Sequence, residues 1–143
     1  MQFIPDEENP DPDPKIIHEE DVPLVDLGER DDVHPTVGIR PVDEVLDLEE
    51  MGVKLWHFEP GEEVGYHAHP EEEELYYVIE GEFSVKMGPA DDPTYTRVGS
   101  GTFFAAGPYE PHGHRCVGDE DGVVLALGAP GSTGNDVLDP HDL

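Results

Sequence analysis

From Gly52 onward large apolar residues recur at every second position, and glycine and proline interrupt this pattern at short intervals. Alternate residues of a strand point to opposite faces, whereas glycine and proline disfavour helix interiors and are common in turns. The alternating segments are short and regularly spaced, at 53–59, 64–69, 74–87, 94–98, 102–106, 112–117 and 123–127. This pattern predicts an all-β protein built as a sandwich or barrel.

The segments outside this pattern are expected to hold little regular structure. Residues 1–23 contain five prolines and eight acidic residues, which is typical of an extended arm. A short edge strand fits 22–27, and one short helix fits 43–50. With 143 residues the chain has the size of one domain. The sequence therefore predicts an arm at 1–23, a β-barrel at 24–129 and a loose acidic tail at 130–143.

The charge of the chain narrows the choice of partners. There are 35 Asp and Glu against 7 Lys and Arg, which gives a net charge of −28. Such a surface repels phosphate backbones and anionic lipids, so neither nucleic acid nor membrane is an expected partner. Self-repulsion also opposes compact folding in dilute salt, and at molar salt it is screened within about 3 Å. We expect a protein of a salt-rich cytoplasm, as in halophiles; the alternative is an ordinary acidic protein.

The sequence also argues against a membrane span, a signal peptide and a disulfide. No apolar stretch reaches the roughly 20 residues of a membrane span, and residues 1–10 lack the basic and apolar regions of a signal peptide. The expected location is therefore the cytoplasm. The single cysteine, Cys116, excludes an intrachain disulfide and an all-cysteine zinc site.

Two histidines that lie two residues apart suggest a metal site. On a strand, His67 and His69 point to the same face, with Cβ atoms roughly 6–7 Å apart. A carboxylate on the next strand can supply a third ligand, and two histidines with one carboxylate leave open positions on non-haem Fe(II) and similar ions. A further histidine, His112, follows in the sequence. The alternative is a pair of surface histidines beside the solvated acidic run 71–74.

The same segment resembles the first motif of the cupin superfamily, G-x5-H-x-H-x4-E-x6-G. The motif positions are matched without a spacing error by Gly61, His67, His69, Glu74 and Gly81. Glu73 fits a shorter spacing from the histidines, but only Glu74 has the required distance to Gly81, so the resemblance assigns Glu74. On this assignment Glu71 and Glu72 are expected to be solvated and Glu73 to face outward.

The second cupin motif, G-x5-P-x-G-x2-H-x3-N, is matched more loosely by residues 101–116. Ala105 stands at the proline position, four residues instead of two separate Gly107 from His112, and Cys116 replaces the asparagine. The resemblance covers residues 46–127 and implies a small single-domain cupin, a double-stranded β-helix or jelly-roll barrel with an extended N-terminal arm. It implies one divalent transition metal (Fe, Mn, Zn, Ni or Co), with the ligands His67, His69, Glu74 and His112.

Strand parity selects candidates for groups next to the metal ligands. Tyr76 follows Glu74 into the barrel, and His114 shares the parity of His112. We take Tyr76, His57 and His114 as candidate catalytic residues, with Arg115 as a further neighbour. For His114 and His57 the alternative is a core histidine bonded to the backbone.

The resemblance leaves the reaction open, because cupins include dioxygenases, isomerases, decarboxylases and epimerases. We expect a metal-dependent enzyme, dioxygenase-like or isomerase-like, acting on a small organic molecule in the barrel. The alternatives are a non-catalytic module that binds or senses a metal or small ligand, and a structural cupin. Few cations are expected to face inward among Lys54, Lys86, Arg97, Arg115 and Arg40. This favours a neutral or weakly charged substrate over a phosphorylated one.

Apolar residues are expected on the outer side of the barrel as well. Leu75, Tyr77 and Ile79 have the parity opposite to Glu74, and Trp56 and Phe58 are assigned outward on their own strand. Apolar faces of this kind are usually buried against another sheet or a second subunit. We therefore expect a homodimer, and the alternative is an ordinary two-sheet core.

Overall fold

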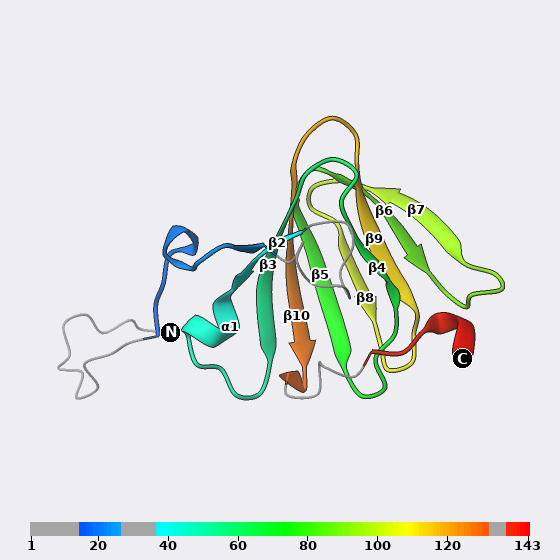
Figure 1. Cartoon of the computed structure of the whole chain (residues 1–143), viewed down its shortest axis with the longest axis horizontal. Coiled ribbons are helices and arrows are strands. Elements are labelled where there is room, and N and C mark those ends of the chain that lie inside the picture. Colours follow the sequence, from blue (N-terminus) through cyan, green and yellow to red (C-terminus); the bar gives the residue numbers. More distant parts are fainter. Residues whose placement is uncertain (1–14, 27–36, 132–136) are drawn as a thin grey trace, which may run out of the picture.

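A computed structural model describes residues 15–26, 37–131 and 137–143, which form two antiparallel sheets (Figure 1). The six-stranded sheet has the order β1-β2-β3-β10-β5-β8, and the four-stranded sheet has the order β4-β9-β6-β7. The strands are β1 Val25–Asp26, β2 Gly38–Pro41, β3 Gly52–Phe58, β4 Glu63–His67, β5 Glu73–Glu80, β6 Glu82–Met87, β7 Thr94–Val98, β8 Phe103–Ala106, β9 His112–Val117 and β10 Gly122–Ala129. The predicted all-β architecture is confirmed.

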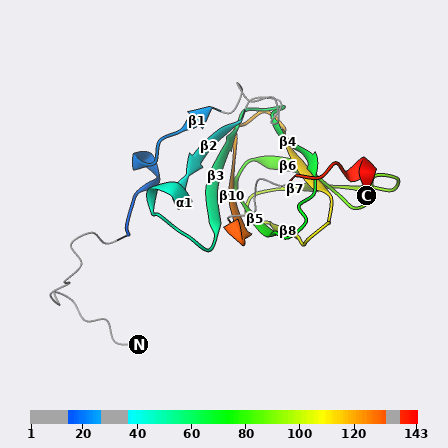
Figure 2. The same ribbon diagram turned by 60° about the horizontal axis from the view of Figure 1, so that its bottom comes forward.

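Helical structure is confined to short pieces among the described residues. They are the 3-10 turns η1 Glu19–Asp21 and η4 Pro140–Asp142 and the single helical turn α1 Val42–Val45. None of these helices is long or apolar enough to cross a membrane. Figure 2 shows the strands arranged around a shared interior, with α1 and η4 on opposite sides of the molecule.

The core lies between the two sheets. The six-stranded sheet contributes Phe58, Val78 and Val124, and the four-stranded sheet contributes Phe83 and Cys116, each of them at most 2% exposed. Phe58 and Phe83 meet edge to face across the interior, with ring centroids 5.0 Å apart. Burying an apolar side chain of this size contributes roughly 1.5–3 kcal/mol to stability. The Phe58–Phe83 contact therefore helps to hold the two sheets together.

Strand β5 has the predicted parity. Tyr76 and Val78 are buried, whereas Leu75 and Ile79 are 40% and 37% exposed. The turn that ends β5 needs glycine at Gly81, because its φ is +88° and a Cβ there would lie 2.8 Å from the Gly122 Cα atom. The motif glycine therefore fixes where β5 stops and where β6 begins.

The outward assignment of Trp56 and Phe58 on β3 is wrong. Phe58 is buried in the core, and Trp56 packs against that core. The register places Trp56 beside Val124, an inward residue of β10. The sequence could not show this, because both alternating sets of β3 contain large apolar side chains.

Both ends of the described chain dock onto the barrel. In the N-terminal segment Val22 is fully buried, and the Arg40 guanidinium donates to the Val22 carbonyl at 2.7 Å. Strand β1 lies within the expected strand 22–27, but Leu27 and the arm residues 1–14 are outside the described residues. In the C-terminal segment Leu138 forms a β-bridge with Ala68, and Pro140 is buried. Residues 137–143 therefore differ from the loose tail that their composition suggested.

Candidate metal centre

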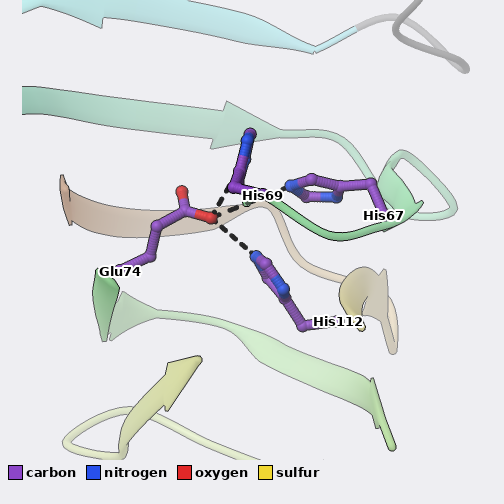
Figure 3. A group of neighbouring side chains, drawn as sticks. All are labelled: His67, His69, Glu74 and His112. Atoms are coloured by element: carbon purple, nitrogen blue, oxygen red, sulfur yellow. Dashed lines mark hydrogen bonds and ion pairs between the residues drawn. The ribbon is translucent and has the colours of Figure 1, made fainter. Parts of the chain in front are cut away.

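Three histidines and one glutamate meet inside the barrel, and we call His67, His69, Glu74 and His112 the ligand cluster (Figure 3). His67 ends β4, His112 begins β9, and the two are paired across these strands. His69 lies in the connection to β5, and Glu74 comes from β5 in the opposite sheet. One ligating atom from each residue lies within 4.8 Å of the others. The structure thus brings together all four predicted ligands.

The imidazole rings present the same nitrogen to one carboxylate oxygen. Glu74 Oε1 lies 2.7 Å from His112 Nε2, 3.2 Å from His69 Nε2 and 3.8 Å from His67 Nε2. These are the atoms that would surround an ion. The side chains converge from both sheets, so the ligand cluster depends on the folded barrel and not on the motif alone.

Backbone carbonyls set the orientation of two of the rings. His67 Nδ1 lies 2.7 Å from the Gly65 carbonyl oxygen, and His112 Nδ1 lies 2.9 Å from the Glu110 carbonyl oxygen. A carbonyl only accepts, so each Nδ1 carries a hydrogen, and Nε2 is the nitrogen that each ring turns toward Glu74. This arrangement is common around protein-bound metals, where it holds the ligating nitrogen in place.

The charges of the ligand cluster also suit a metal. Burial, helped by the neighbouring His112, lowers the pKa of His67 to about 4. Burial alone would raise the pKa of Glu74, but hydrogen bonds from His112 and His69 outweigh it and hold that pKa well below its usual range. At neutral pH the donors therefore include a neutral imidazole and an ionised carboxylate. Imidazole nitrogens with a carboxylate fit Fe, Mn, Co, Ni or Zn, so the residues present fit the predicted divalent ion.

Tyr76 is the candidate catalytic residue that lies at the ligand cluster. Its hydroxyl donates to Glu74 Oε2 at 2.9 Å and lies 3.1 Å from His112 Nε2. The side chain is 2% exposed, and burial together with the Glu74 charge raises the pKa of Tyr76 well above its usual value. Tyr76 thus stays protonated and fixes the second oxygen of Glu74, leaving Oε1 toward the histidines.

His114 lies deeper in the barrel, beside Tyr76 but not among the ligands. Neither ring nitrogen has a hydrogen-bond partner, and burial, followed by the charge of His112, lowers the pKa of His114 to about 3. Aromatic rings surround it at centroid distances of 5.1–5.8 Å, from Tyr76, Phe104, Phe58 and Phe83. His114 is therefore a neutral core histidine held by ring contacts, with no hydrogen bond to the backbone.

His57 and Arg115 are not brought to the ligand cluster. His57 lies on the outer face of the six-stranded sheet, where it accepts a hydrogen bond from Arg40 Nε at 3.2 Å. As a candidate catalytic residue His57 would have to face inward, but its strand neighbours Trp56 and Phe58 occupy the interior. The Arg115 side chain is exposed and pairs with Glu63 at 3.2 Å. Neither side chain contacts the four predicted ligands.

Glu72 is the residue near the site that sequence reasoning missed. We expected it to be solvated, but its side chain is only 8% exposed, and Oε1 lies 3.9 Å from His69 Nε2. A Cβ at Gly128 would lie 2.8 Å from the Glu72 carboxylate carbon. A glycine inside the apolar strand β10 was the available signal, because strand glycines often mark a close approach. Glu71 and Glu73 are exposed, as expected.

The longer spacing between Gly107 and His112 has a structural use. Tyr109 adopts a left-handed backbone with φ +63°, and its N–H donates to the His69 carbonyl at 2.7 Å. The next residue, Glu110, supplies the carbonyl that orients His112. The two added residues thus tie together the segments that carry two of the ligands.

The fold and site can be compared with known proteins. Comparison with curated protein sequences finds no match. Among solved structures, the chain resembles an Acidithiobacillus ferrooxidans protein described as a sugar phosphate isomerase, with 28% identity and a TM-score of 0.59. That match covers 66% of this chain and spans only 59% of the length of the other protein.

Two further structures cover more of the chain. A Thermotoga maritima protein described as an oxalate decarboxylase is 18% identical, with a TM-score of 0.70 over 80% of this chain and 98% of that one. An RmlC-like cupin from Shewanella frigidimarina is 21% identical, with a TM-score of 0.65 over 87% and 97%. At these identities the likeness shows a shared fold, which is the predicted double-stranded β-helix.

A family model described as a cupin domain matches residues 54–128, which is more than half of the 143 residues. The matched range contains the ligand cluster and both motif segments. The chain therefore belongs to the cupin domain family.

Proposed function

We propose that this protein is a metal-dependent enzyme that acts on a small organic molecule inside the barrel. The observation that carries the proposal is the convergence of three Nε2 atoms on one oxygen of Glu74. A divalent ion bound there would polarise a substrate oxygen or activate dioxygen. The cupin fold does not fix the reaction, because one fold hosts many chemistries.

The residues of the chain would prepare this site in two ways. Tyr76 holds its proton beside Glu74 and His112, where it can orient a bound substrate by a hydrogen bond. Tyr76 is 2% exposed and stacks on Phe104 with centroids 4.7 Å apart, so little water would reach its hydroxyl. Substrate would thus meet the metal ligands in a dry, aromatic surrounding, where electrostatic effects are strong.

One observation favours the alternative of a non-catalytic binding module. His114, a candidate proton carrier, is enclosed by rings and has no hydrogen-bond partner for either nitrogen. Tyr76 is then the one candidate catalytic residue of this chain that contacts the ligand cluster among the described residues. A module that holds a metal and a small ligand needs no proton carrier.

Turnover separates the two functions. The full chain, purified in molar salt, should contain about one transition metal per chain by elemental analysis. Loaded with Fe(II), Mn(II), Co(II), Ni(II) or Zn(II), it should then be screened for dioxygen uptake and for isomerisation of small hydroxy and carbonyl compounds. Tyr76→Phe should keep the metal and lower kcat by at least about tenfold, since a positioned hydroxyl is lost. Ligand binding without turnover under every metal would identify a binding module instead.

We also propose that the protein forms a homodimer through an outer apolar face, defined by Leu75, Tyr77, Ile79, Phe103, Leu125 and Leu127 on β5, β8 and β10. Leu75 is paired with Leu127, and Tyr77 with Leu125 and Phe103, so the side chains are neighbours on one face. Phe103 is 65% exposed. Two copies with a charge of −28 each repel, and these six apolar residues form a face on which the copies can approach with less repulsion.

Oligomeric state in solution tests this face. In molar KCl the wild-type chain should sediment as a dimer, and Phe103→Glu should sediment as a monomer, because it places two added charges in the contact. Tyr95→Glu is the matched control, since Tyr95 on β7 is also 65% exposed but lies on the other sheet. A wild-type monomer at micromolar concentration, or a Phe103→Glu dimer, would contradict the proposal.

A further inference from the structure

Glu72 places a second carboxylate beside the ligand cluster. Its side chain is 8% exposed, and Oε1 lies 3.9 Å from His69 Nε2, the nitrogen that faces Glu74. Strand β10 leaves room for the carboxylate at Gly128, where a Cβ would lie 3.0 Å from both Glu72 oxygens. The packing of β10 thus keeps a negative group inside the barrel, next to a ligating nitrogen.

The described cations balance this charge only in part. Lys54, on the inner side of β3, acts on Glu72 through its charge, but its ammonium is 2.7 Å from Asp43. The other described Lys and Arg residues contact other groups, namely Lys15 the Asp47 carbonyl, Arg40 the Val22 and Glu19 carbonyls, Lys86 the Tyr66 ring, Arg97 the Glu82 carboxylate and Arg115 the Glu63 carboxylate. Each described Lys or Arg thus has a partner outside the ligand cluster, and holding a phosphate or carboxylate of a ligand there would require that contact to change.

A divalent ion in the ligand cluster would be balanced by Glu72 and Glu74 together, since each carboxylate contributes one negative charge. An incoming anion would then add a negative charge that the described residues leave uncompensated. At short range in a buried site, the resulting repulsion lowers the affinity for the anion several-fold or more.

We propose that Glu72 is a specificity-determining residue, whose carboxylate keeps phosphorylated and other anionic ligands from the metal and admits neutral molecules bearing hydroxyl or carbonyl groups. The inference rests on the proposed metal site and names its substrate class. That class differs from the sugar phosphate named for the Acidithiobacillus ferrooxidans protein.

Anion binding to the Co(II)-loaded full chain tests the proposal without an assay of activity. Visible absorption of the bound Co(II) reports ligand binding at one constant KCl concentration, with inorganic phosphate as the anion and imidazole as the neutral probe. Wild-type protein should bind imidazole more tightly than phosphate. Glu72→Gln should tighten phosphate binding by at least about tenfold and change the imidazole Kd by less than about twofold, because only the charge is removed.

Matched variants make the outcomes decisive. Glu71→Gln removes the same charge from an exposed neighbour and should leave both Kd values within about twofold. Glu72→Ala, which vacates the space, should reproduce the gain in phosphate affinity. Unchanged phosphate binding in both Glu72 variants overturns the proposal, as does wild-type protein that prefers phosphate. If Glu72→Gln loses Co(II), Glu72 is a ligand and the proposal is wrong. If the wild-type chain takes up no Co(II), the proposed function itself fails.

Discussion

The double variant His67→Ala/His69→Ala is expected to lose its bound metal. Elemental analysis should fall from about one ion per wild-type chain to below about 0.1, because two of the four donors are removed. The remaining pair, Glu74 and His112, already bond to each other at 2.7 Å and offer an ion no closed set of ligands. A chelator should lower the Tm of the wild-type chain and leave the Tm of the double variant unchanged, since only the former is stabilised by binding.

Two single variants locate the carboxylate ligand. Glu74→Gln should weaken metal binding sharply, because it removes the anionic oxygen on which the three Nε2 atoms converge. Glu73→Gln is the matched control, since Glu73 is exposed and points to the other face of β5. A double-histidine variant that binds one ion with unchanged affinity would disprove the assignment, and damage from Glu73→Gln would show a shifted register.

The ligand cluster was predictable because its main constraints are local in sequence. His67 and His69 are separated by one residue, and Gly81 fixes the end of β5 through its left-handed φ of +88°. In the cupin motif, spacing to that glycine identifies Glu74, and parity along β5 then places Tyr76 inside. Motif spacing, strand parity and the glycine turn are all local in sequence, so the resemblance and the geometry of one strand were enough for these steps.

The missed features depend on contacts between distant segments. Parity on β3 was ambiguous because both faces carry apolar residues, and only the neighbour β10 shows that Trp56 points inward. Glu72 looked solvated within a run of four acids, and its burial requires the space left at Gly128, far along the chain. Docking of residues 137–143 likewise rests on a bridge between Leu138 and Ala68. Composition alone describes none of these pairings.

Stability is expected to rise steeply with salt. The Tm should increase by about 10 °C or more between dilute buffer and 1 M KCl, if screening removes a few kcal/mol of repulsion. The net charge of −28 supplies that repulsion. Among the described residues, Lys and Arg form ion pairs with carboxylates at Lys54–Asp43, Arg97–Glu82 and Arg115–Glu63, and the last two pairs are largely exposed. Exposed pairs contribute little, so they do not offset the excess of acids.

The shape of the salt response identifies screening as its cause. The Debye length falls from about 10 Å at 0.1 M to about 3 Å at 1 M, so most of the increase in Tm should occur below 1 M KCl. If the salt stabilised the fold by being excluded from the protein surface, the Tm would instead keep rising above 1 M. Replacing the exposed acids Asp91, Asp92 and Asp119 by Lys lowers the net negative charge and should flatten the response. Circular dichroism melts across the KCl range measure both effects. A Tm that stays constant from dilute to molar salt would contradict adaptation to a salt-rich cytoplasm, and an equal slope in the lysine variant would show that net repulsion is not its source.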